Sequence, residues 1–367
     1  MNKSDISRDA CQLYGAQSTH GYDWWWHSFT AEDAETGEQK PFFIEFFACN
    51  PALGGKYPLF GTEGGKPSYL MIKVGTWCGE DRVQLHRFFG WQKVRMDMGT
   101  PFEIRAYNCH LSETQTSGSV SVSVETSRTH PEYMSDPGFI SWKLSIRKRV
   151  AFNVGYGASA IMRRLQLFEM FWHAEGMKTE YEGEIHYNGR HYIVRPETCY
   201  GYADKNWGKD FTSPWVWLSS CNLISETTGK KLTDSVFDIG GGRPKIGPLT
   251  LNRQLLSDFW YEGKSYEFNF SKFWTGCRTS FKCSETETQI QWHVEQRTWF
   301  NRMVTDVTCN KEDMLLVRYQ SPDGARRHRR LWNGGNGRGT IRLYRFGRLI
   351  DRIHAENVGC EYGEYSE

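Results

Sequence analysis

The residues best suited to acid–base chemistry gather in one run near the middle of the chain. Asp204 and Lys205 are adjacent, and Tyr202 lies two positions before Asp204. A buried carboxylic acid can protonate an alkene if burial raises its pKa, and indole and phenol faces stabilise the carbocation that results. Rings of both kinds stand close by: Tyr200, Trp207, Trp215 and Trp217. The run therefore predicts proton transfer in an aromatic pocket, with Asp204, Lys205 and Tyr202 as catalytic residues.

Several other groups compete for these roles. Glu175 is a further candidate catalytic residue, and Glu361 or Asp210 could be the acid instead. His173 and Asn222 join Tyr200, Trp207, Trp215 and Trp217 as candidate substrate-binding residues. A salt bridge from Lys205 would lower the pKa of Asp204 and make the pair structural. An aromatic run with an Asp-Lys pair is also typical of a core strand beside a solvated turn.

The elements that hold this run follow from its pattern. After Pro214, residues 215–218 are apolar at every position, which predicts a strand buried on both faces. Gly208 interrupts regular structure before it. We therefore expect residues 204–206 to lie in a loop at the edge of an apolar surface, the usual make-up of a small-molecule site.

The same run resembles a known family. Residues 202–208, followed by Pro214-Trp-Val-Trp217 and by Asn222, are similar to the Lys-Asn-Trp-Gly, Pro-x-x-Trp-x-Trp and Cys-Asn signature of the tocopherol cyclase family. This resemblance implies a lipocalin-like enzyme of two β-barrel-like domains, an apolar ligand and acid-catalysed addition to an alkene. The specific match covers residues 202–222, and a weaker similarity of layout extends over most of the chain.

Hydrophobic periodicity predicts a mainly β protein. Residues 119–124, 140–146 and 289–295 alternate strictly, as strands with one buried face do. Residues 181–187 and 190–194 flank Asn188-Gly189, the favoured two-residue hairpin turn. The regular spacing of such runs favours antiparallel barrels or sandwiches. We expect two lipocalin-like domains, residues 1–177 and 178–367.

One helix is predicted between residues 158 and 172, where it would connect the domains or plug a barrel. Its apolar residues recur at helical spacing: Ile161, Leu165, Phe168 and Trp172.

Composition argues against several classes of partner and cofactor. The chain has 45 basic and 43 acidic residues, a balance that does not favour nucleic acid or an anionic membrane. No run of 18 apolar residues and no apolar leader is present, so we expect a cytoplasmic protein without a transmembrane segment. The ten cysteines form no CxxC pair, and Gly335-Asn-Gly337-Arg-Gly339 precedes a strand rather than a helix. We therefore expect no metal and no nucleotide cofactor.

Three interpretations of function remain open. The first is a cofactor-independent cyclase, hydratase or isomerase acting on an apolar isoprenoid- or polyketide-like molecule in an aromatic-lined cavity. The second is a lipocalin-like carrier that binds such a ligand without chemistry, and the third is a structural protein with a filled core. A cavity that holds a carboxyl group together with a Lys or Tyr favours the enzyme. The substrate and the oligomeric state stay open.

Overall fold

The structure is a computed structural model that describes residues 5–61, 65–154, 164–165, 168–211, 213–243, 245–246, 249–250, 254–327 and 330–364. As predicted, this part of the chain is mainly β. Its α-helix is the short α1, Val124–Thr129. Single 3₁₀ turns lie at Ile6–Arg8, Gly15–Ser18, Pro51–Leu53, Trp91–Lys93, Pro131–Tyr133, Phe273–Thr275 and Lys311–Asp313. No helix among these residues is long and apolar enough to cross a membrane.

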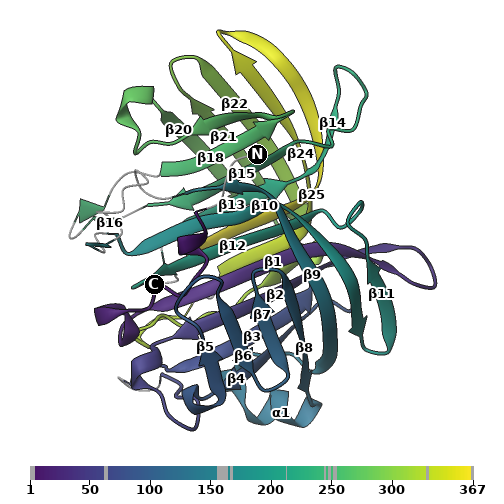
Figure 1. Cartoon of the computed structure of the whole chain (residues 1–367). Coiled ribbons are helices and arrows are strands. Elements are labelled where there is room, and N and C mark those ends of the chain that lie inside the picture. Colours follow the sequence, from purple (N-terminus) through teal and green to yellow (C-terminus); the bar gives the residue numbers. More distant parts are fainter. Residues whose placement is uncertain are drawn as a thin grey trace.

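The first half of the chain folds into one antiparallel sheet of 12 strands. Its path runs β4-β3-β2-β1-β11-β10-β9-β8-β7-β6-β5, and β12 pairs with both β1 and β10. The sheet curls into a barrel-like body, the lower half of Figure 1. The strands are β1 Tyr22–Asp33, β2 Gln39–Cys49, β3 Tyr69–Thr76, β4 Val83–Phe89, β5 Val94–Met96, β6 Glu103–Ala106, β7 Cys109–Ser112, β8 Gln115–Val122, β9 Gly138–Phe152, β10 Met170–Tyr187, β11 Arg190–Val194 and β12 Gly201–Gly208.

The second half forms a separate antiparallel sheet of 11 strands, the green and yellow part of Figure 1. Its path runs β19-β18-β15-β13-β25-β24-β22-β21-β20, with β14 on β25 and β23 on β24. The strands are β13 Trp215–Ser220, β14 Asn222–Ser225, β15 Val236–Gly242, β18 Gln254–Tyr261, β19 Lys264–Phe268, β20 Arg278–Glu285, β21 Gln289–Arg297, β22 Asn301–Asn310, β23 Met314–Leu316, β24 Arg330–Arg345 and β25 Arg348–Glu364. A small hairpin, β16 Lys245–Ile246 with β17 Leu249–Thr250, stands apart.

Three large hydrophobic cores take up most of the aromatic residues, and Phe168, Phe171 and Trp207 form a small fourth cluster. One fills the first sheet, one fills the second, and the third lies between the sheets. β1 is buried on both faces: Trp25 points into the first core, whereas Trp26 points into the core between the sheets. Because successive side chains of a strand alternate between faces, a strand shared by two cores is apolar at nearly every position.

The C-terminal end of the helix predicted over residues 158–172 is wrong. Met170, Phe171 and Trp172 open β10 and pair with Gly208, Trp207 and Asn206 of β12. Aromatic residues pack well on a pleated sheet, and this pairing overrides a helical pattern of only a few positions. Residues 155–163, 166 and 167 lie outside the described residues.

The strands also bear on the predicted hairpin and on the expected domain boundary. The predicted hairpin is confirmed, with β10 and β11 joined at Asn188-Gly189, both at positive φ. The expected domain boundary at residues 177 and 178 falls inside β10, whereas strand pairing passes from the first sheet to the second between Gly208 and Trp215.

Candidate active site

The strand β12 places the central run between the two sheets. The expectation that residues 204–206 form a loop is wrong, because they lie in the middle of β12 and are buried. Asp204 pairs with Trp26 of β1, and Asn206, two residues further along β12, pairs with Trp172 of β10. Alternation along β12 sends Tyr202 and Asp204 toward the second sheet, while Lys205 points to the opposite face. The predicted strand after Pro214 is confirmed as β13, which is buried throughout.

Asp204 is a buried carboxyl group with one oxygen left without a partner. Trp172 Nε1 donates a hydrogen bond of 2.8 Å to Asp204 Oδ2, and Tyr202 donates to the same oxygen at 3.2 Å. Oδ1 has no hydrogen-bond partner among the described residues. Burial raises the pKa of Asp204 well above its ordinary value, and the nearby Glu361 raises it further. The hydrogen bond from Trp172 opposes this shift, but the net change favours the protonated form of Asp204.

Tyr202 joins Asp204 to a second buried carboxyl group. Its hydroxyl lies 3.2 Å from Asp204 and 3.2 Å from Asp238 of β15, which also accepts a hydrogen bond of 3.1 Å from Trp217 Nε1. A phenol has one proton and can donate to one carboxyl group at a time. Burial raises the pKa of Asp238 well above its usual range, and a carboxylate at Asp204 would raise it further. A neutral Asp238 can donate its own proton to the phenol oxygen.

Glu361, on β25, faces the same space from the second sheet. Trp215 Nε1 donates to Glu361 at 2.6 Å, and Asn333 Nδ2 donates to its other oxygen. Asn333 is itself held by the indole N–H of Trp77, the residue that follows β3. Burial raises the pKa of Glu361 to about 7, although these donors oppose the shift. Glu361 can therefore give or take a proton near neutral pH.

An ion pair on the first sheet holds the phenol of Tyr319 in place. Lys73 Nζ lies 3.0 Å from Glu45 and 3.3 Å from the centre of the Tyr319 ring. The Tyr319 hydroxyl donates to Glu45, with oxygen distances of 2.9 and 3.0 Å. Burial raises the pKa of Glu45 and lowers the pKa of Lys73 to about 8. The attraction between Glu45 and Lys73 opposes both pKa shifts and favours the charged form of each group.

Between these groups lies a small cavity. It leaves about 10 Å³ for the centre of a water-sized molecule, roughly the room that one water needs. Its lining is Trp24, Trp26, Asp204, Trp215, Trp217, Tyr319 and Glu361. A second cavity of the same size shares Trp24, Trp215, Tyr319 and Glu361 and adds the apolar Met170, Phe211 and Leu331. Carboxyl groups, a phenol and indole faces thus meet in one place.

Glycines of the second sheet let the site indoles approach its backbone. A Cβ atom on Gly359 would lie 2.3 Å from the Trp217 ring, and one on Gly240 would lie 2.6 Å from the Trp172 ring. Both indoles donate to site carboxyl groups. Only a residue without a side chain fits at these positions.

Lys205 has a different environment from its neighbour Asp204. Its ammonium group is fully buried, forms an ion pair with Asp23 and lies 4.3 Å from the ring centre of Trp25 and 5.1 Å from that of Trp207. The suggested Asp204–Lys205 salt bridge is wrong, because adjacent residues of a strand face opposite ways. Lys205 does not line the cavity that Asp204 lines.

Glu175 and His173 also lie away from this cavity. His173 Nε2 is 3.1 Å from Asp9, and Lys148 lies 3.2 Å from Asp9 and forms an ion pair with Glu175. Burial raises the pKa of Glu175 to about 7. These groups tie the N-terminal segment to β9 and β10.

The remaining predicted binding residues do not line this cavity, although Tyr200 lines a different small pocket together with Tyr202 and Trp217. Trp207 stacks on Phe171 at 5.5 Å between ring centres. Asn222 donates a hydrogen bond of 2.7 Å to Asn357, and the Tyr200 hydroxyl accepts one of 2.8 Å from Lys231. The structure thus brings together Asp204, Tyr202, Trp215 and Trp217 of the predicted set.

Sequence reasoning missed the supporting charges, although the chain carried a signal for them. Glu45, Lys73 and Asp238 are each the single charged residue within an otherwise apolar stretch of strand. A charge at a buried strand position is costly unless it is paired or neutral. Such positions point to polar partners, but they do not say which ones.

Three comparisons relate the chain to known proteins. The sequence pattern of the family described as tocopherol cyclase-like matches residues 102–352. Among curated proteins, none matches. Kievitone hydratase from Nectria haematococca has a similar structure, with a TM-score of 0.52, 9% identity and coverage of 100% of this chain and 96% of that one. A putative AttH from Nitrosomonas europaea has a TM-score of 0.49 and 11% identity, with coverage of 99% and 96%.

Proposed function

The chain belongs to the tocopherol cyclase-like family, and we propose that it is a cofactor-independent cyclase or hydratase acting on an apolar isoprenoid- or polyketide-like molecule. The family supports an enzyme of the cyclase or hydratase type. One observation carries the rest: Asp204, whose raised pKa favours the protonated form, has an oxygen without a partner among the described residues and lines a cavity walled by indoles and a phenol. A carrier of apolar molecules has no need for two carboxyl groups at that position.

The chemistry begins with Asp204. Its proton passes to one carbon of a substrate alkene, which leaves a carbocation on the other carbon and a carboxylate on Asp204. The faces of Trp24, Trp26 and Trp217 stabilise the cation through their ring quadrupoles. The water-poor walls protect it from unwanted attack.

Glu361 completes the step as the base. An oxygen nucleophile attacks the cation and passes its proton to the Glu361 carboxylate. If the nucleophile is a hydroxyl of the substrate, the product is a cyclic ether and an isomer of the substrate; if it is water, the product is an alcohol. Two carboxyl groups whose surroundings separate their pKa values are the usual basis of such an acid–base pair. Proton exchange with solvent returns both groups to their starting states.

The two adjoining cavities support an elongated substrate. The polar end would lie by Glu361 and Tyr319, and an apolar tail would extend toward Met170, Phe211 and Leu331. As the cavities stand they have room for about one water each, so a substrate must displace side chains. The half-buried Trp24 borders both cavities and is the first ring expected to move.

Incubation in D₂O with prenylated phenols and related isoprenoid alkenes tests the proposal. Cyclisation or hydration should place one non-exchangeable deuterium at the protonated alkene carbon, and the product mass distinguishes an isomer from a hydrate. Mass spectrometry follows both. If every compound that binds is recovered without deuterium, the enzyme proposal fails and the carrier interpretation is supported.

A further inference from the structure

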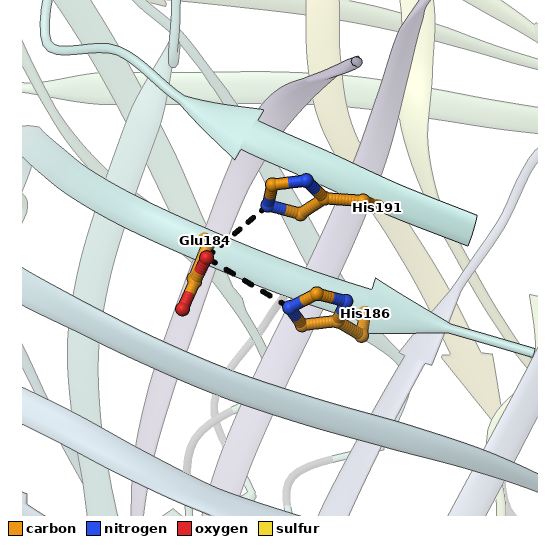
Figure 2. A group of neighbouring side chains, drawn as sticks. All are labelled: Glu184, His186 and His191. Carbon is orange, nitrogen blue, oxygen red and sulfur yellow. Dashed lines mark hydrogen bonds and ion pairs between the residues drawn. The ribbon is translucent and has the colours of Figure 1, made fainter. Parts of the chain in front are cut away.

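We infer that the hairpin of β10 and β11 binds a late first-row divalent cation such as Zn²⁺ through Glu184, His186 and His191. The three side chains project from the same face of the hairpin and converge, as Figure 2 shows. This site is separate from the cavity that Asp204 lines, so the inference does not rest on the proposed enzyme activity.

Strand register brings the two imidazoles together. His186 of β10 lies directly opposite His191 of β11, and Glu184 is two residues from His186, on the same face. The Asn188-Gly189 turn fixes this register. The side chain of Asn188 also accepts a hydrogen bond of 3.0 Å from the backbone N–H of Phe139, on the neighbouring β9. The backbone therefore places the three ligand residues next to one another before any cation arrives.

The distances suit a single small cation. The His191 and His186 Nε2 atoms lie 3.2 and 3.8 Å from the same Glu184 oxygen, and all three ligand atoms fall within 4.8 Å of one another. In a tetrahedral zinc site with bonds of about 2.0–2.2 Å, neighbouring ligand atoms are roughly 3.4 Å apart. The imidazole rings of His186 and His191 are stacked, with 6° between their planes and 4.5 Å between their centres. Small rotations of the side chains would complete the metal geometry.

The chemistry of the ligands selects the metal. Two imidazoles and one carboxylate suit Zn²⁺, Cu²⁺ or Ni²⁺ better than Mg²⁺ or Ca²⁺, which prefer oxygen ligands alone. The three side chains are each 42–49% exposed, so an ion can enter from solvent. Glu184 and His191 also line an open groove of about 730 Å³, which leaves room for a water or an exogenous ligand on the cation.

Among the residues that the structure describes, other histidine–carboxylate contacts lack a third metal ligand. His354 lies 3.4 Å from Glu356, and His293 lies 2.6 Å from Asp306, each as a pair. Within the described parts of the chain, Glu184, His186 and His191 are the group of three possible metal ligands whose ligand atoms all lie within 4.8 Å of one another. His354 therefore offers a matched control: a partly exposed strand histidine with a carboxylate partner two residues away.

Isothermal titration of metal-free protein with ZnCl₂ tests the site. We expect one Zn²⁺ per chain, and His186→Gln or His191→Gln should each weaken binding more than about tenfold, since loss of a supporting group alone costs about 10–100-fold. His354→Gln should bind as the wild type does. Zn²⁺ should also raise the Tm of the wild type but not of the His186→Gln/His191→Gln double variant.

A spectroscopic measurement guards against variants that fail to fold. Co²⁺ substituted into the wild type should give visible absorption bands of a site with nitrogen and oxygen ligands, and these should be absent from a double variant with an unchanged far-UV circular dichroism spectrum. The inference is overturned if the wild type shows no saturable Zn²⁺ binding. It is equally overturned if the folded double variant binds Zn²⁺ as tightly as the wild type.

Discussion

Replacing Asp204 with asparagine should remove catalysis while preserving the site. The structure allows this separation because Asp204 is held by two donors, Trp172 and Tyr202, and both reach the same oxygen. An asparagine carbonyl can accept both hydrogen bonds. Since burial raises the pKa of Asp204 and so favours its neutral form, the substitution places a neutral amide where a neutral acid is favoured. Asp204 forms no ion pair among the described residues that the substitution could break.

The expected sizes of the two effects differ widely. A positioned general acid contributes about 10²–10⁴-fold to rate, so kcat should fall by that factor, which is about 3–5 kcal/mol of barrier. The free energy of unfolding should fall by no more than about 1–3 kcal/mol, the cost of an unsatisfied amide N–H where Oδ1 now lies. Substrate affinity should change by less than about tenfold, because apolar contacts do not depend on the proton.

The assay compares this variant with a matched control. Asp258, on β18, is likewise buried, its pKa is raised to about 7, and one of its oxygens has no partner among the described residues. It does not line the cavity of Asp204. Deuterium incorporation by Asp204→Asn and Asp258→Asn should be measured in D₂O under single-turnover conditions, with substrate binding and urea denaturation measured on the same samples.

Two results would refute the reasoning. If Asp204→Asn incorporates deuterium at the wild-type rate, Asp204 is not the proton donor. If both variants lose activity and stability together, the carboxyl groups are structural, and the aromatic core with its buried acids needs no catalytic explanation.

Three further outcomes follow from the structure. Lys205→Met should lower the free energy of unfolding by about 3–5 kcal/mol, because it leaves the Asp23 carboxylate buried without its partner, and adding Asp23→Asn should restore part of the loss in urea denaturation. Glu361 has a pKa of about 7 in the folded state and about 4.5 in the unfolded state, so only the folded state keeps this proton between these two pH values. The free energy of unfolding should therefore fall by about 3 kcal/mol as pH rises from about 4.5 to about 7. Glu361→Gln should remove this part of the pH dependence. Gly359→Ala should push the Trp217 ring out of place and lower the free energy of unfolding by about 1–3 kcal/mol, which a lower Tm would show. An unchanged Tm would show that the contact is not tight.

Much of the fold could be predicted from local sequence. Strict alternation at residues 140–146 and 289–295 indicated strands that form parts of β9 and β21, and Asn188-Gly189 marked a hairpin. These signals are local because the two-residue strand period and positive-φ turns are properties of short segments. The helix predicted over residues 158–172 failed at its C-terminal end because pairing with a distant strand, β12, decided the outcome.

The sequence by itself determined that Asp204 and its aromatic neighbours were the residues to examine, since a carboxyl group among indoles is visible in the chain. Only the tertiary structure decided which groups join it. Glu361 and Tyr319 reach Asp204 from strands and loops more than a hundred residues away, while the adjacent Lys205 turns to Asp23 on the other face of the sheet. Neighbours in sequence are separated by strand alternation, and neighbours in space are chosen by which sheets pack together. The sequence pattern shows strand alternation, but it does not show which sheets pack together.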